Sequence, residues 1–136
     1  MSEAEPLLVV EDDALTARSL LRLLRLGGYE VRFATSCAEA LNVDRRFRAA
    51  ILDVDLPDGN GVALAAELCS REVVEAVVFF TACTDAASLR RAAALGEVVA
   101  KGASGPEVLS AVRQARPPQT AKPPETTLRN ASGETT

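Results

Sequence analysis

Residues 49–61, AAILDVDLPDGNG, combine an apolar run, an acid and a turn within thirteen positions. The short apolar run from Ala49 to Leu52 stops on Asp53, and such a run bounded by turn residues is typical of a strand covered on both faces in a parallel sheet. Pro57 and Gly59-Asn60-Gly61 then impose a turn before the next helical pattern begins. Ligands of open α/β sheets bind at the carboxyl ends of the strands. The stretch therefore predicts a buried strand that delivers Asp53 to a ligand-binding edge.

Segments of strand and helix character alternate along the rest of the chain. Strands are expected at 6–10, 30–34, 49–52, 76–81 and 97–100, and helices at 14–26, 37–46, 62–72, 85–95 and 105–116. Capping-box spacing opens two of these helices, at Ser36-Cys37-Ala38-Glu39 and at Ser104-Gly105-Pro106-Glu107. Because parallel strands need right-handed crossovers, five βα units predict an α/β fold, a (βα)5 doubly wound parallel sheet with strand order 2-1-3-4-5.

Composition excludes several classes of function. The 136 residues suit one domain, the net charge of −4 without a basic cluster argues against direct nucleic-acid binding, and no apolar run approaches a membrane span. We therefore expect a cytoplasmic protein, in which Cys37, Cys69 and Cys83 stay reduced. The absence of histidine excludes a Ser-His-Asp triad, a histidine-ligated zinc site and a histidine phosphocarrier in this chain.

The predicted strand order brings four chemically active strand ends into one crevice: Glu11-Asp12, Asp53, Thr81 and Lys101. Carboxylates a few ångströms apart repel one another, so they need a cation or raised pKa values. An all-oxygen ligand set suits Mg²⁺ or Mn²⁺ better than zinc. A metal beside a carboxylate, a hydroxyl and a lysine favours phosphoryl transfer, with the carboxylate as nucleophile.

Each residue also has a simpler structural interpretation. Acids after a strand commonly start a helix or a turn, Thr81 can satisfy a backbone carbonyl, and Lys101 can be a surface lysine. For Lys101 the simpler interpretation is weaker, because the first 116 residues contain 12 arginines and only this lysine. Gly59-Asn60-Gly61 fits no phosphate-binding or dinucleotide motif and is interpreted only as a turn.

Four segments together resemble the receiver domains of two-component response regulators, in order and in approximate spacing: VVEDD, LDVDLPDGNG, FFTA and VVAK. The resemblance covers residues 6–116 and implies the flavodoxin-like receiver fold of single-domain, chemotaxis-regulator-like proteins. It implies that Asp53 is the phosphoacceptor, and that a sensor histidine kinase or a histidine phosphotransfer protein is the donor. It further implies a site for Mg²⁺ (or Mn²⁺) formed by Asp53, by Asp12 as a direct ligand, by Glu11 through a water molecule and by Asp55 through its backbone carbonyl. Phosphoryl-binding or switch roles are implied for Thr81, Ala82 and Lys101.

The chain departs from the family pattern on the last strand. Val98 stands where the family usually has an aromatic residue, Gly102 replaces the proline that commonly follows the lysine, and the stretch from Gly96 to Lys101 is about two residues short. The family implies a downstream protein that binds the face of the fourth helix, fifth strand and fifth helix. The departures therefore concern that output surface more than the phosphorylation chemistry.

Two other functions are compatible with parts of this sequence. Asp53-Val54-Asp55 resembles the DxD pair of haloacid-dehalogenase-type phosphatases, but there the pair lies on the first core strand and an acidic group follows the lysine. A phosphorylation-independent, receiver-like adaptor is the other alternative. We expect no enzyme, a receiver domain over residues 1–116, and a disordered tail or linker over 117–136, where proline and threonine are frequent and apolar periodicity is absent.

Overall fold

A computed structural model describes residues 4–118. The strands are β1 (Pro6–Val10), β2 (Glu30–Ala34), β3 (Phe47–Leu52), β4 (Asp55–Leu56), β5 (Gly59–Asn60), β6 (Val74–Thr81) and β7 (Glu97–Ala100). The helices are α1 (Ala14–Leu26), α2 (Cys37–Leu41), α3 (Gly61–Ser70), α4 (Ala86–Leu95) and α5 (Gly105–Gln114). The predicted alternation of strands and helices is confirmed.

Five strands form one parallel sheet in the order β2-β1-β3-β6-β7. This order is the predicted 2-1-3-4-5 arrangement. Val10 on β1 pairs with Leu52 on β3, and Leu52 pairs with Phe79 on β6. Because these strands end in register, the residues that follow β1 and β3 lie next to each other at one edge of the sheet.

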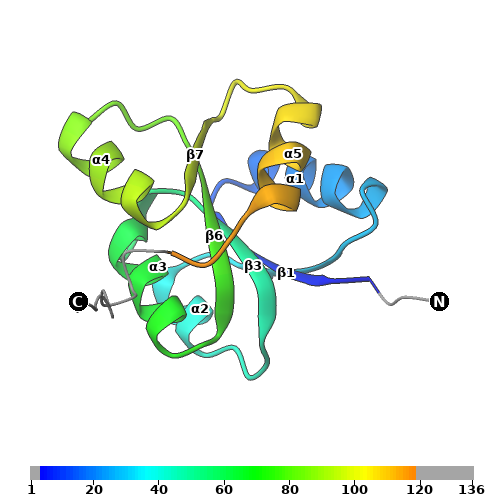
Figure 1. The fold of residues 1–136 in the computed structure, drawn as a ribbon, viewed down its shortest axis with the longest axis horizontal. Helices are drawn as coiled ribbons and strands as arrows, with labels where there is room; N and C mark the ends of the chain where they lie inside the picture. Colours follow the sequence, from blue (N-terminus) through cyan, green and yellow to red (C-terminus); the bar gives the residue numbers. More distant parts are fainter. Residues whose placement is uncertain (1–3, 119–136) are drawn as a thin grey trace, which may run out of the picture.

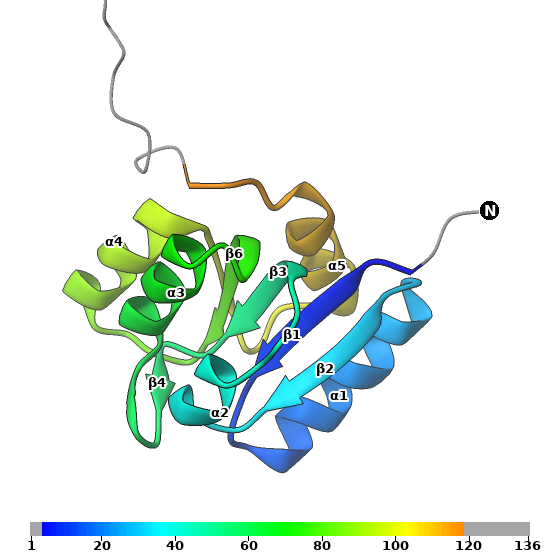
Figure 2. The same cartoon turned by 90° about the horizontal axis from the view of Figure 1, so that it is seen from below.

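Helices cover both faces of the sheet (Figure 1, Figure 2). One face packs under α1 and α5. There Leu20, Leu24, Val108 and Val112 belong to one cluster with residues of β1 and β3: Leu7, Val9, Ala49 and Ile51. The other face packs under α2, α3 and α4, which contribute Ala40, Leu64, Leu68 and Ala92. Strands buried on both faces explain why their sequences are continuous apolar runs rather than alternating ones.

Several element boundaries differ from the sequence-based expectation. Helix α2 ends at Leu41 instead of near Arg46, because residues 42–46 form the loop that returns the chain to the sheet. Strands β3 and β6 begin two residues early, since Phe47 pairs with Val74 and extends the ladder. The turn after Asp53 contains a short antiparallel pair, β4 with β5, that no periodicity indicates.

The expected tail, residues 117–136, lies outside the described residues apart from Pro117 and Pro118. Within residues 4–118, none of the helices combines the length and apolar character needed to cross a membrane.

Candidate functional site

Asp53 is the centre of a buried polar cluster at the carboxyl edge of the sheet. It follows β3 directly, and its backbone N–H donates to the carbonyl of Val10 at 3.3 Å. Its side chain is buried, with 7% of the residue exposed. The Thr81 hydroxyl donates to Oδ1 at 2.6 Å, and the Lys101 ammonium donates to Oδ2 at 2.8 Å. Both oxygens of Asp53 are therefore held by groups that suit a phosphoryl oxygen equally well.

Lys101 also pairs with Glu11, which is almost fully buried at 2% exposure. Lys101 Nζ lies 3.1 Å from Glu11 Oε1. Burial raises the pKa of Glu11 above its ordinary value, although hydrogen bonds from the Asp13 N–H and from Lys101 oppose the rise. Burial alone would lower the pKa of Lys101, but its hydrogen bonds to Asp53 and Glu11 outweigh that effect and raise it. The lysine is thus held as a cation between two carboxylates.

Asp12 completes a group of acids that can hold a metal ion. One oxygen each from Glu11, Asp12 and Asp53 lies within 4.8 Å of the others. Glu11 and Asp53 are buried whereas Asp12 is exposed, so the group opens to solvent on one side. Three carboxylates around one position fit a hard divalent cation, whose oxygen ligands include carboxylates and water.

Asp55 lies beside this group rather than within it. Its backbone N–H donates to Asp53 Oδ1 at 3.2 Å, and its side chain is exposed on β4. The position keeps the backbone of Asp55 near the acceptor. Its expected role as a metal ligand through the backbone carbonyl stays a prediction.

Thr81 connects the acid cluster to the start of α4. Its hydroxyl oxygen accepts a hydrogen bond from the backbone N–H of Cys83 at 3.1 Å while the hydroxyl donates to Asp53. Asp85 then caps α4 by accepting from the N–H of Ser88. One side chain and one short loop therefore link Asp53 to the first turn of α4.

Gly61 is a supporting residue that the sequence-based interpretation missed. A Cβ at this position would lie 1.9 Å from the carbonyl oxygen of Asp53, and the Gly61 N–H donates to the Val54 carbonyl at 2.6 Å. Only glycine allows the backbone to approach the acceptor this closely. The Gly-Asn-Gly pattern suggested a turn, but nothing local in the sequence showed that this turn folds back onto Asp53.

Asp58 is a second residue whose contact was not expected. Its carboxylate accepts from the backbone N–H groups of Cys37 at 2.8 Å and Ala38 at 3.1 Å, and so it joins the turn after Asp53 to the start of α2. These backbone hydrogen bonds lower the pKa of Asp58. The contact spans 21 residues of sequence, which local patterns do not reveal.

The remaining positions expected to take part in the switch are Ala82 and Val98, and Gly102 is the departure that follows Lys101. Ala82 and Gly102 are exposed, next to Thr81 and Lys101 respectively. Val98 on β7 pairs with Phe79 and packs, half-buried, against the core under α2, α3 and α4. The structure thus brings Glu11, Asp12, Asp53, Thr81 and Lys101 together, whereas Val98 belongs to the core.

Comparison with known proteins identifies the family. The model of the response regulator receiver domain matches residues 7–113, so this chain belongs to the response regulator receiver domain family. The expected fold and family are confirmed, and with them the general function of a phosphoacceptor receiver in two-component signalling.

Individual relatives agree with this result. The acid tolerance regulatory protein ActR of Rhizobium meliloti is 31% identical over 123 residues, which are 88% of this chain and 63% of ActR. This chain thus spans less than two thirds of that relative.

Two solved structures are of similar response regulators that contain bound ions. The response regulator TrrA of Thermotoga maritima, in complex with Mg²⁺-BeF, is 26% identical, with a TM-score of 0.72 over 81% of this chain and 97% of TrrA. A response regulator from Burkholderia pseudomallei, with a phosphorylated aspartic acid, calcium ion and citrate, is 27% identical. Its TM-score is 0.73 over 81% of this chain and 67% of that one.

Proposed function

We propose that Asp53 accepts a phosphoryl group from a histidine of a sensor kinase or a histidine phosphotransfer protein, and that this changes partner binding. The observation that carries the proposal is the buried Asp53 carboxylate, held by Thr81 and Lys101 next to Glu11 and Asp12. This chain has no histidine, so the phosphohistidine must belong to a partner.

The transfer forms one bond and breaks one. A carboxylate oxygen of Asp53 attacks phosphorus, a P–O bond forms, and the P–N bond to the donor imidazole breaks, leaving the imidazole to take up a proton. Lys101 neutralises charge on the transferred group because its ammonium is already held at the acceptor. Once Asp53 is an acyl phosphate, the Thr81 hydroxyl is free to donate to a phosphoryl oxygen.

We further propose that the site works with Mg²⁺ or Mn²⁺, held by Glu11, Asp12 and Asp53 together with the backbone of Asp55. The support is the closeness of the three carboxylates and their incomplete neutralisation by one lysine. A divalent cation bound there supplies the counter-charge that an acidic crevice needs before an anionic phosphodonor can approach.

The signal leaves the site through Thr81 and the loop from Ala82 to Asp85, in this proposal. The Thr81 hydroxyl oxygen accepts from the Cys83 N–H, so moving the hydroxyl toward a phosphoryl group pulls on the loop before α4. Val98 is β-branched and has no ring to rotate, so the aromatic part of the family's switch is missing. The downstream partner is assigned to the face formed by α4, β7 and α5.

The order of the site residues argues against the alternatives. The acidic pair precedes Asp53 in sequence and no comparable acids follow Lys101, unlike the haloacid-dehalogenase arrangement. The acceptor, hydroxyl and lysine are all present and in contact, which a phosphorylation-independent adaptor does not need. We therefore propose a cytoplasmic signalling receiver without enzymatic turnover, comprising residues 1–116, with 117–136 as a tail or linker.

The test is intact-mass analysis after incubation with acetyl phosphate and Mg²⁺. Wild-type protein should gain one phosphoryl group, and Asp53→Asn should gain none. Asp55→Asn is the matched control, because it removes a nearby exposed carboxylate but keeps the backbone, and it should still be labelled. Labelling that survives in Asp53→Asn would show that the acceptor is another residue, and turnover of a generic phosphate ester by the wild type would favour the phosphatase.

A further inference from the structure

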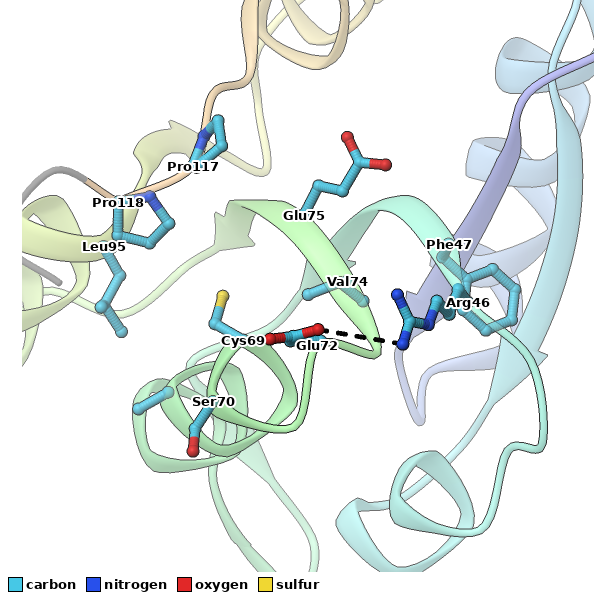
Figure 3. A pocket seen from close by; sticks show the side chains of 11 residues that line it. Arg46, Phe47, Cys69, Ser70, Glu72, Val74, Glu75, Leu95, Pro117 and Pro118 are labelled. Carbon is cyan, nitrogen blue, oxygen red and sulfur yellow. Dashed lines mark ion pairs between the residues drawn. The ribbon is translucent and has the colours of Figure 1, made fainter. Parts of the chain in front are cut away.

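A cavity of about 600 Å³ lies at the end of the sheet opposite Asp53, and we call it the basal cavity (Figure 3). It opens between the start of β6 and the ends of α3 and α4. Most of its lining is apolar, from Phe47, Val74, Leu95, Pro117 and Pro118, with the half-buried Cys69 among them. The basal cavity is thus a hydrophobic site that the phosphorylation chemistry does not use.

The chain leaving α5 is directed to this cavity. Arg48 Nη2 donates to the carbonyl of Ala115 at 3.0 Å, and Ala115 has extended backbone angles of φ −60° and ψ 135°. The chain therefore leaves the axis of α5 and crosses toward α3 and α4, as both views of the ribbon show (Figure 1, Figure 2). Pro117 and Pro118 already form part of the cavity wall.

The polar groups at the cavity are mainly acidic. Arg46 pairs with Glu72 at 3.8 Å, which leaves Glu75 as the uncompensated charge (Figure 3). Glu75 is exposed and makes no salt bridge within residues 4–118. A segment that covers this cavity should therefore combine apolar residues with a positive charge.

The next residues of this chain have that composition. Residues 119–124 read QTAKPP and contain Lys122, the first lysine after Lys101. We propose that residues 119–124 dock in the basal cavity of their own chain, with the Lys122 ammonium beside Glu75. A polyproline-like chain advances about 3.1 Å per residue, so the six residues 119–124 are long enough to cross a cavity of about 600 Å³.

Tethering favours this occupant over a second copy of the chain. A segment attached at the cavity rim has an effective concentration in the millimolar range, so even weak apolar and charge contacts suffice. A second molecule at micromolar concentration would have to displace it. The inference does not depend on phosphorylation of Asp53.

Cys69 provides a direct reporter of docking. Full-length protein is pulse-labelled with iodoacetamide, and the alkylation rate of each cysteine is read from its peptide mass. When residues 119–124 are replaced by a Gly-Ser sequence of equal length, Cys69 should react about threefold faster or more, as expected when a mostly covered site opens. Cys37 and Cys83 lie outside the cavity lining, so their rates should not change and they serve as internal controls.

Charge variants test the pairing. Lys122→Glu should speed the alkylation of Cys69, Lys122→Arg should not, and Glu75→Lys combined with Lys122→Glu should restore protection. Faster alkylation distinguishes undocking from a local charge effect. If the segment stayed docked, the added negative charge would raise the pKa of the Cys69 thiol and slow the reaction.

Two results would overturn the proposal. Equal Cys69 rates in the wild type and in the Gly-Ser replacement would mean that residues 119–124 do not cover the cavity. Protection of Cys69 that falls on dilution of the wild type would assign the cavity to a second copy of the chain. Amide chemical shifts of Val74 and Leu95 give an independent readout and should change on the Gly-Ser replacement.

Discussion

The substitution Gly61→Ala should damage both stability and phosphorylation. The added Cβ would lie 1.9 Å from the Asp53 carbonyl oxygen, whereas an ordinary contact begins at 3.4 Å, so the backbones must separate by 1.5 Å (3.4 minus 1.9). Such a shift breaks the 2.6 Å hydrogen bond from the Gly61 N–H to the Val54 carbonyl. Overpacking costs about 1–3 kcal/mol and the lost hydrogen bond about 1 kcal/mol, so we expect a loss of roughly 2–4 kcal/mol.

The same displacement moves the acceptor. A misplacement near 1 Å at a reacting group lowers rates by about a hundredfold. We therefore expect slow phosphorylation of Gly61→Ala by acetyl phosphate under conditions in which the protein remains folded. Urea unfolding followed by circular dichroism measures the first effect, and intact-mass time courses measure the second.

Gly102→Ala is the matched control. Gly102 follows Lys101 at the same edge of the sheet, but a Cβ there meets no atom within 4 Å, so both measurements should stay close to those of the wild type. If Gly61→Ala is as stable and as readily phosphorylated as Gly102→Ala, the close approach to Asp53 does not constrain the acceptor and the reasoning is wrong.

Three further substitutions test the acids, the lysine and the last strand. Asp12→Ala should weaken Mg²⁺ binding far more than Asp13→Ala in titration calorimetry. Asp12 belongs to the group of three acids, whereas Asp13 caps α1 by accepting hydrogen bonds from Thr16. Equal losses of Mg²⁺ affinity would exclude Asp12 as the metal ligand. Lys101→Met should lower the free energy of unfolding in metal-free buffer by about 2–4 kcal/mol, somewhat below the cost for a fully buried pair because the lysine side chain is 25% exposed. Added Mg²⁺ should restore more stability to this variant than to the wild type in thermal denaturation, and an equal gain would contradict the role of Lys101 as counter-ion. Val98→Tyr should leave the acetyl phosphate reaction nearly unchanged but enlarge the phosphorylation-dependent amide shifts of α4 and β7, since it supplies the missing ring; unchanged shifts would show that an aromatic there does not couple to the site.

Local patterns predicted most of the fold because the sheet is buried on both faces. A strand such as β3 must then be a continuous apolar run, and it must end where the polar edge begins. Helix starts were predictable for a similar reason, because their capping residues are close together in sequence. Ser104 and Glu107 form the predicted capping box on α5, in which each side chain bonds the other residue's backbone N–H. The grouping of the polar strand-end residues could be predicted from the strand order. Right-handed crossover connections leave few possible strand orders for such a sheet.

Boundaries that depend on pairing were less predictable. Phe47 and Val74 extend β3 and β6 because they pair with each other. Neither segment by itself shows that this pairing partner is present. Helix α2 is correspondingly short, since its expected last turn is needed as the loop that brings Phe47 to the sheet.

The parallel α/β fold, the family resemblance and the set of residues at the acidic edge could be predicted from the sequence, because buried strands, caps and strand-end side chains are encoded within a few residues of each other. The contacts among those residues depend on the packed fold: Thr81 and Lys101 each hold one oxygen of Asp53, and Gly61 packs against its carbonyl. The basal cavity is also a tertiary feature, because its walls come from elements that are distant in sequence. The physical reason is that distances between side chains depend on packing across crossovers, whereas the patterns that a sequence displays are local.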